Sequence, residues 1–188
     1  MRRLVGLTIV VLAWTGTVAA RNDVKERTEA ARAAATAFGM TLIGELQKAI
    51  AAGGPANAIG VCNVIAAKIA ADMSAEKSMK IGRTSLKLRQ PSNKPDEWEL
   101  RQLQSFERRK AAGENPANIE VGEYVDKAGK TLFRYMKAIP TGELCLNCHG
   151  SALAPEVAAK LRQLYPQDAA TGFKAGDLRG AFTITESP

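Results

Sequence analysis

The residues best suited to chemistry lie in one stretch, Cys145-Leu146-Asn147-Cys148-His149. The stretch has the form C-x-x-C-H, which is typical of covalent c-type haem attachment. In this motif the cysteine sulfurs bind the edge of the porphyrin, and the adjacent histidine binds the iron as its proximal ligand. His149 is the one histidine in the chain. We therefore predict a single, covalently attached haem c, with Cys145 and Cys148 holding the porphyrin and His149 the iron.

Two other interpretations of the motif are open. A short pattern with three fixed positions can arise by chance. Alternatively, Cys62, Cys145, Cys148 and His149 could form a Cys3His zinc site. Zinc sites usually separate paired ligands by several residues, whereas Cys148 and His149 are neighbours. We favour haem, because the N-terminus carries the export signal that c-type haem attachment requires.

That signal occupies residues 1–20. Arg2 and Arg3 precede the apolar run Leu4–Trp14, and small residues ending in Val18-Ala19-Ala20 resemble a cleavage site. The apolar run is shorter than the ~20 residues that span a bilayer. We expect cleavage, with retention as an anchor as the alternative, and no membrane span after removal. The protein would then be periplasmic or otherwise exported, in an oxidising compartment.

The charge of the chain bears on its partners. The formal net charge is +7, and removal of Arg2 and Arg3 would leave +5. Aromatic residues make up only 5% of the chain, and no basic cluster is interleaved with them. This composition favours acidic partners or haem propionates over nucleic acid.

The mature chain, residues 21–188, has a length that suits a single domain. Apolar residues from Val24 to Ala49 recur at helical spacings and predict a long helix from Arg21 to about Ala52. Gly53-Gly54 would end it, and Pro55 would begin a second helix with Cys62 on its apolar stripe. We interpret the first helix as packing along a sheet. The alternative is a homodimer seam or a signalling stalk.

The remaining pattern predicts a strand over Met79–Arg89 with Arg83, Ser85, Lys87 and Arg89 on one face. This basic face either protects a sheet edge or clamps the haem propionates, since arginine binds carboxylates with two hydrogen bonds. The order of strands and helices favours an α+β fold with an antiparallel sheet. The further elements that we expect are helices over 96–112 and 156–164 and strands over 119–125, 131–139 and 177–185, with the C-x-x-C-H motif in a loop.

The second axial position of the iron needs a residue from elsewhere in the chain. Bis-histidine ligation is excluded, because there is no second histidine. A methionine would raise the reduction potential, whereas a thiolate would lower it. Spacing alone does not choose among the candidates, which are Met40, Met73, Met79, Met136, Cys62, water or no ligand.

Four separated segments resemble, in the same order, the pattern of a family of exported c-type haem proteins. The segments are Ala58–Cys62, Ile81–Glu99, the C-x-x-C-H motif and Gly176–Ala181. That family has a PAS-like haem domain, which occurs alone or as the sensing part of membrane signalling proteins. The resemblance implies a PAS-like antiparallel sheet flanked by helices. It also implies that Cys62 is the distal axial ligand opposite His149.

Cysteine–histidine ligation favours a redox or small-ligand sensor, because a thiolate can be protonated, oxidised or displaced. The alternative is an electron-transfer cytochrome that docks on an acidic redox partner. A peroxidase-type enzyme needs distal acid–base groups. With no second histidine to supply them, we expect no enzymatic activity.

Overall fold

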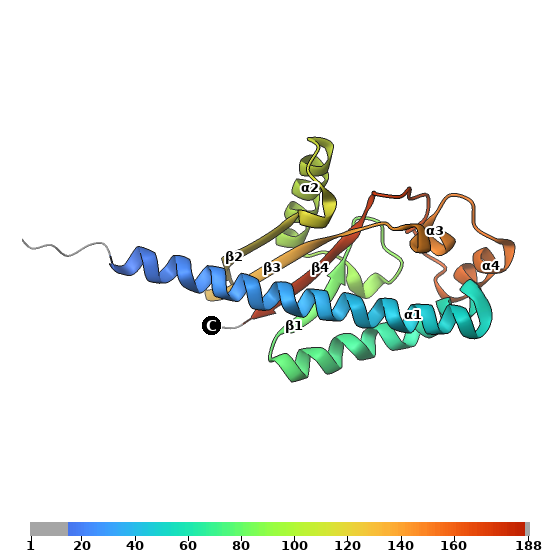
Figure 1. Cartoon of the computed structure of the whole chain (residues 1–188), viewed down its shortest axis with the longest axis horizontal. Helices are drawn as coiled ribbons and strands as arrows, with labels where there is room; N and C mark the ends of the chain where they lie inside the picture. Colours follow the sequence, from blue (N-terminus) through green and yellow to red (C-terminus); the bar gives the residue numbers. More distant parts are fainter. Residues whose placement is uncertain (1–14, 187–188) are drawn as a thin grey trace, which may run out of the picture.

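The longest element is α1 (Thr15–Lys77), which bends back on itself as a hairpin of two helical arms (Figure 1). The computed structural model describes residues 15–186, so most of the predicted signal peptide lies outside the described residues. The arms meet at Gly53 and Gly54, whose backbones are not helical. Gly54 has a φ of 74°, which glycine adopts without strain, and Pro55 opens the second arm. The predicted pair of helices is confirmed.

Four strands form one antiparallel sheet in the order β1-β4-β3-β2. A tight turn at Ala128 and Gly129 joins β2 to β3, and both residues have positive φ. The α+β fold with an antiparallel sheet is therefore confirmed, while its PAS-like character stays a prediction. The strand bounds are β1 (Lys80–Thr84), β2 (Glu120–Lys127), β3 (Lys130–Pro140) and β4 (Leu178–Glu186).

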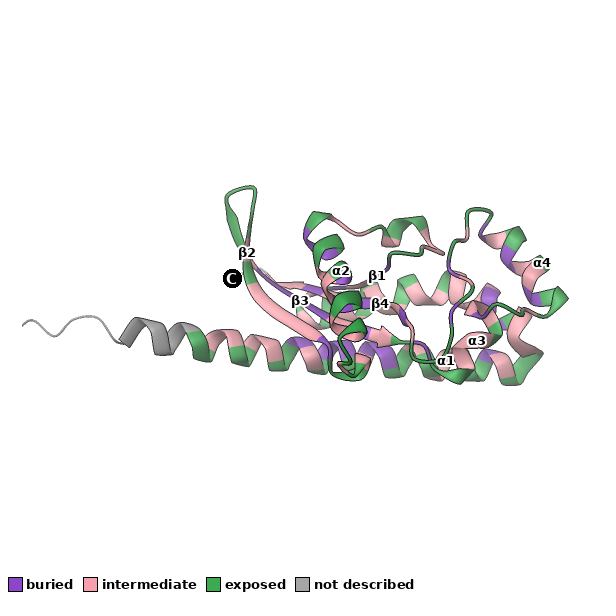
Figure 2. Ribbon diagram, turned by 90° about the horizontal axis from the view of Figure 1, so that it is seen from above, coloured by how far each residue is buried: buried purple, intermediate pink, exposed green. Residues whose placement is uncertain are grey.

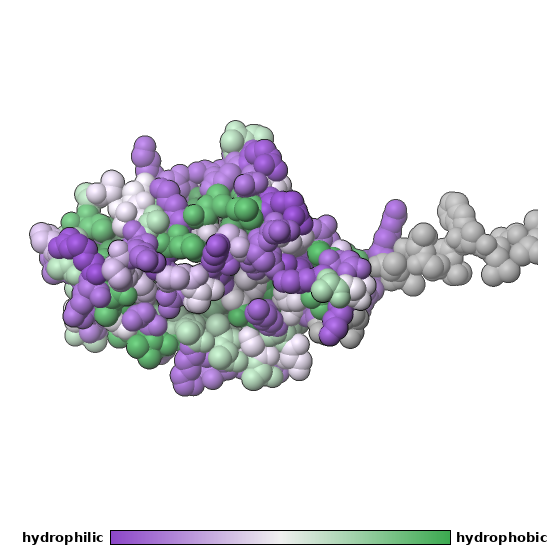
Figure 3. Space-filling view, turned by 180° about the vertical axis from the view of Figure 1, so that it is seen from behind, coloured by the Kyte–Doolittle hydropathy of each residue, from purple (hydrophilic) through white to green (hydrophobic). Residues whose placement is uncertain are grey.

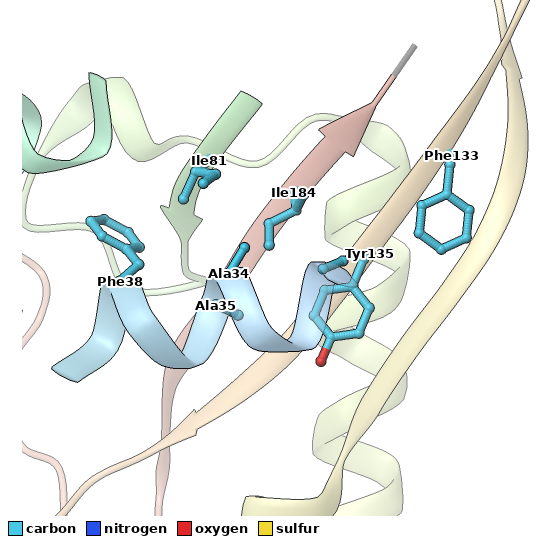
Figure 4. Packing of buried hydrophobic residues seen from close by; sticks show 8 residues of the cluster. Ala34, Ala35, Phe38, Ile81, Phe133, Tyr135 and Ile184 are labelled. Carbon is cyan, nitrogen blue, oxygen red and sulfur yellow. The ribbon is translucent and has the colours of Figure 1, made fainter. Parts of the chain in front are cut away.

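The first arm of α1 packs along one face of the sheet. Ala34, Ala35 and Phe38 share one buried cluster with residues of the sheet; Ala34 points toward Ile184, and the ring of Phe38 lies on the side of Ile81 (Figure 4). The small alanines let the helix approach closely, and the phenylalanine fills the remaining space. Burial of a side chain such as that of Phe38 stabilises the fold by about 3 kcal/mol. The interpretation that this helix packs on a sheet is confirmed, and Figure 2 shows buried turns of α1 where it runs along the strands.

The opposite face of the sheet is covered by α2 (Glu97–Ala111). Asp96 and Glu99 form a capping box at its start, as an acidic first turn favours. Trp98 and Phe106 pack against β3 and β4. Two short 3-10 turns flank α2 in the chain, η1 (Pro91–Asn93) and η2 (Pro116–Asn118).

Two short helices lie beside the turn of the α1 hairpin, α3 (Glu143–His149) and α4 (Pro155–Leu164) (Figure 1). The second agrees with its prediction. The first contains the C-x-x-C-H motif, so the expected loop is a helix instead. Its residues include no proline and no β-branched side chain, and Gly142 and Gly150 bound it. A helix places Cys145 and Cys148 three positions apart, on neighbouring sites of one face.

The predicted strand Met79–Arg89 is wrong beyond Thr84. Ser85 turns the chain away from the sheet: its hydroxyl donates to Arg179 O at 2.7 Å and accepts from the Lys87 N–H at 3.2 Å. The alternation of apolar and basic residues continues past this point, but Leu86 is 46% exposed. Side-chain hydrogen bonding to the backbone therefore overrides the period-two pattern.

One described helix, α1, is long and apolar enough to cross a membrane by length and composition, and it lies near the N-terminus. Part of its apolar surface packs on the sheet instead. Large exposed apolar side chains on it include Met40, Ile43 and Val64. On the face in Figure 3, apolar areas are interspersed with hydrophilic ones. The absence of a span after signal removal stays a prediction.

Candidate cofactor-binding site

A cleft of about 280 Å³ opens between the α1 hairpin and the end of the sheet that carries α3. Its walls are largely apolar and come from both arms of α1, from the end of β3 and from β4. Sites for flat organic cofactors are lined in this way, with a few polar groups that set orientation. The apolar lining includes Leu42, Ile43, Leu46, Ile50, Ala58, Ile59, Ala66, Leu88, Ile139, Pro140, Leu144 and Phe182.

All four sulfur and imidazole groups of interest line this cleft. Cys145, Cys148 and His149 enter it from α3, and Cys62 enters it from the second arm of α1. The three cysteines are half-buried and free. Among the described residues, no group of three or more His, Cys, Asp or Glu could hold a metal ion. The zinc alternative therefore has no support from the geometry.

The methionines considered as iron ligands do not line the cleft. Met136 is fully buried in the core between the sheet and α2, and Met40 is 70% exposed. Met73 and Met79 pack against the core between α1 and the sheet. Of the side chains proposed for the second axial position, the structure places only Cys62 in the cleft.

The His149 ring is fixed by a backbone acceptor. Its Nδ1–H donates to Ala170 O at 2.7 Å, so in the neutral ring Nε2 carries the lone pair. Nε2 lies 3.4 Å from both Arg89 Nη1 and Arg179 Nε. Burial, together with these cations, lowers the pKa of His149 to about 3. The ring is therefore neutral, and Nε2 is the nitrogen whose lone pair could bind a metal; here that lone pair accepts from Arg179 Nε.

Three guanidinium groups line the cleft, those of Arg83, Arg89 and Arg179. The lining contains no Asp or Glu. Arg89 is paired from behind by Asp168, at 2.9 Å, whereas Arg83 and Arg179 have no carboxylate partner among the described residues. Burial and the neighbouring arginines lower the pKa of Arg179 to about 10. The cleft thus holds two positive charges without counter-charges, which suits an anionic ligand.

The structure separates the three basic residues that the sequence singled out. Arg83 and Arg89 line the cleft. Lys87 does not: its Nζ lies 5.0 Å from the centre of the Phe173 ring, and the residue borders a different, smaller hollow. The reason is the turn at Ser85, which ends the strand that would have aligned Lys87 with Arg83 and Arg89.

The half-buried thiols of Cys62 and Cys148 have different charged neighbours. Burial raises the pKa of both Cys62 and Cys148. Arg83 and Arg89 oppose this rise at Cys62, since a nearby cation favours the thiolate. Cys62 is therefore a thiol in this cleft whose thiolate form has two cationic neighbours.

Sequence reasoning missed three residues of the site. Arg179 lies in the segment Gly176–Ala181, where a charged side chain stands between the buried Leu178 and Ala181. A charged residue between these apolar positions was the feature of the sequence that could have identified Arg179. Asp168 and Ala170 come from the irregular stretch after α4, and no pattern in the sequence links a backbone carbonyl there to His149.

Comparison with known proteins places this site in context. The cyanobacterial heme-protein Tll0287 has a crystal structure with the same fold, at a TM-score of 0.65 and 23% identity, and the match covers 86% of this chain and 95% of that one. A comparison with curated protein sequences gives no significant match. The model of the Tll0287-like family matches residues 13–187, which is nearly the entire sequence. The chain therefore belongs to the Tll0287-like family.

Proposed function

We propose that this protein binds one haem c in the cleft beside α3. Cys145 and Cys148 would attach the porphyrin, and His149 Nε2 and Cys62 Sγ would bind the iron from its two sides. The observation that carries the proposal is that His149, whose Nδ1–H is held by Ala170 O, lines the same cleft as all three cysteines. A structurally similar protein is itself a heme-protein, which supports the choice of haem as the cofactor.

The residues present fit a haem in three respects. The walls are apolar, as a porphyrin requires. Arg83 and Arg179 supply two guanidinium charges without carboxylate partners, which matches the two propionates of a haem. Cys145 and Cys148 are free thiols, so each can add across a vinyl group: sulfur bonds one carbon and the proton goes to the other, with no net oxidation. Bound there, haem would supply a one-electron redox couple.

The role that we propose is that of a redox or small-ligand sensor outside the cytoplasm. Cys62 supports this role, because its thiolate can be protonated, oxidised or displaced from iron. Electron transfer to an acidic partner is a second candidate, favoured by the net charge of +5 that the chain would keep after removal of Arg2 and Arg3. Export through the N-terminal signal is part of the proposal, since covalent haem attachment requires it.

Spectra of the variant Cys62→Ala test the ligand assignment. We expect the matured variant to keep its covalent haem but to lose the thiolate-type absorption bands of the wild type. The matched control is Met40→Ala, which truncates an exposed candidate ligand outside the cleft and should leave the spectrum unchanged. An unchanged spectrum for Cys62→Ala would remove Cys62 from the iron.

The same samples discriminate between the two roles. A sensor predicts that carbon monoxide or a thiol-modifying reagent displaces Cys62 and changes the spectrum of the wild type. An iron that stays six-coordinate under both treatments, and that exchanges electrons rapidly with an acidic partner, would favour electron transfer instead.

A further inference from the structure

We propose that Asp168 is a positioning residue for His149, which holds the acceptor of the Nδ1 proton in place and keeps Arg89 paired. The inference rests on the proposed function, because its consequence is a control of the iron through the histidine. Asp168 lies in the irregular stretch after α4, and the Asp168 side chain does not line the cleft.

The first contact joins Asp168 to the backbone that orients the histidine. Its Oδ1 accepts from Ala170 N at 2.8 Å, and Ala170 O accepts from His149 Nδ1 at 2.7 Å. The carboxylate therefore fixes the very residue whose carbonyl fixes the imidazole. Ala170 is fully buried, so no solvent competes with this chain of hydrogen bonds. Such partners orient a ligating histidine and raise its basicity.

The second contact joins Asp168 to Arg89. Asp168 Oδ2 accepts from Arg89 Nε at 3.1 Å and pairs with Nη2 at 2.9 Å. Nη2 also donates to Cys148 O at 2.6 Å and to Ala170 O at 3.3 Å. The Arg89 and Asp168 side chains are only 12% and 8% exposed. This arginine is thus tied to the backbone on both sides of His149.

These contacts have a shared consequence for His149. Arg89 Nη1 lies 3.4 Å from Nε2, the nitrogen proposed to bind iron. Without Asp168, Arg89 would lose its counter-charge and would face Nε2 more freely. The acceptor for Nδ1–H would also lose its support. Both changes make the histidine a poorer donor to iron, and the loss of the Asp168 carboxylate also removes negative charge from the site. Each therefore favours ferrous over ferric haem.

The test uses Asp168→Asn in the matured haem protein. Asparagine loses the charge that pairs Arg89, and it offers Ala170 N only a neutral, weaker acceptor in place of the carboxylate. We expect the redox equilibrium to shift about tenfold toward the ferrous state, which for a one-electron couple is about 59 mV. We also expect faster hydrogen exchange of His149 Nδ1–H in the diamagnetic ferrous protein, measured by NMR.

Asp177→Asn is the matched control. Asp177 also accepts from a backbone N–H, that of Lys174 at 2.8 Å, and pairs with a cation, Lys110 at 2.7 Å. It makes no contact with His149 among the described hydrogen bonds, so both readouts should match the wild type. A merely structural role for Asp168 would lower the stability of Asp168→Asn and leave its reduction potential unchanged.

The outcomes separate the inference from the proposed function. If the wild type holds covalent haem while Asp168→Asn shifts the equilibrium less than twofold and leaves the exchange rate unchanged, the role of Asp168 is refuted. If the wild type holds no haem, the proposed function fails. The ¹⁵N NMR spectrum of the colourless protein then tests the role of Asp168. Loss of the Nδ1–H form of His149 in Asp168→Asn, but not in Asp177→Asn, would support that role. An unchanged spectrum in Asp168→Asn would overturn it.

Discussion

Glu120 couples the first arm of α1 to the sheet, and its removal should weaken the fold in a pH-dependent manner. Both of its carboxylate oxygens accept from Arg32 Nε, at 2.9 and 3.0 Å, and one also accepts from the buried Tyr135 hydroxyl at 2.7 Å. The hydrogen bond from Arg32, more than the opposing burial, lowers the pKa of Glu120 from 4.5 to about 2. The variant Glu120→Gln keeps the shape of the side chain and removes its charge.

The magnitude follows from this pKa. A value of about 2 in place of 4.5 corresponds to about 3 kcal/mol in favour of the charged form. The Arg32 side chain is 42% exposed, so solvent screening reduces the expected contribution to about 2 kcal/mol. Because the folded-state pKa is lowered, this contribution is present above pH 4.5 and is lost as the pH falls toward 2. Glu120→Gln should therefore be less stable than wild type at pH 7 and equally stable near pH 2.

Urea unfolding followed by circular dichroism at a series of pH values measures this difference. The control is Glu114→Gln, which removes an equally forked pair with Arg109 whose two side chains are 35% and 38% exposed. Because solvent screens both of its members, that pair should contribute less than the pair of Arg32 and Glu120. A difference between Glu120→Gln and wild type that stays constant from pH 7 to pH 2 would refute the reasoning, because it would not arise from the carboxylate charge.

Two further predictions concern the sheet. Arg134→Met should destabilise the fold by about 3–5 kcal/mol, because it leaves Glu99 and Asp96 without a buried partner. Lys127→Met removes an exposed partner of Asp96 and should lose less than about 1 kcal/mol in the same urea assay. Equal losses would show that burial does not set the strength of this network. Gly180→Ala should lower the free energy of unfolding by more than about 2 kcal/mol, since the φ of Gly180 is 154° and a Cβ would overlap Thr84 O. Gly129→Ala, with a φ of 75° and open space around it, should lose about 1 kcal/mol, and a larger loss there would contradict the steric argument.

The parts of the fold that were predictable are those in which local pattern and tertiary packing agree. The apolar spacing of α1, the break at Gly53-Gly54 and the capping box at Asp96 each determine a structure without distant partners. The predicted strand over Met79–Arg89 failed at Ser85, because its hydroxyl bonds Arg179 O, 94 residues away in the sequence. No local pattern encodes such a partner.

The same division holds for the candidate site. Cys145, Cys148 and His149 were recognisable because their spacing in sequence is itself the chemical requirement. Spacing alone did not distinguish Cys62 from the methionines as the second axial ligand, and the resemblance to a family favoured Cys62. The fold adds an independent reason, since the second arm of α1 places Cys62 in the cleft and no candidate methionine lines it. Arg179 contacts His149 from the start of β4, and Ala170 contacts it through a backbone carbonyl. Only the folded chain brings these two positions to the histidine.

The central claim is that the cleft holds a haem bonded to Cys145 and Cys148. The pyridine haemochrome spectrum of the protein, matured in a host with c-type haem attachment, tests it most directly, together with acid-acetone extraction. We predict the absorption maximum of a haem with both vinyl groups saturated and pigment that stays with the protein. A colourless protein, or pigment that moves into the acetone, would contradict the account.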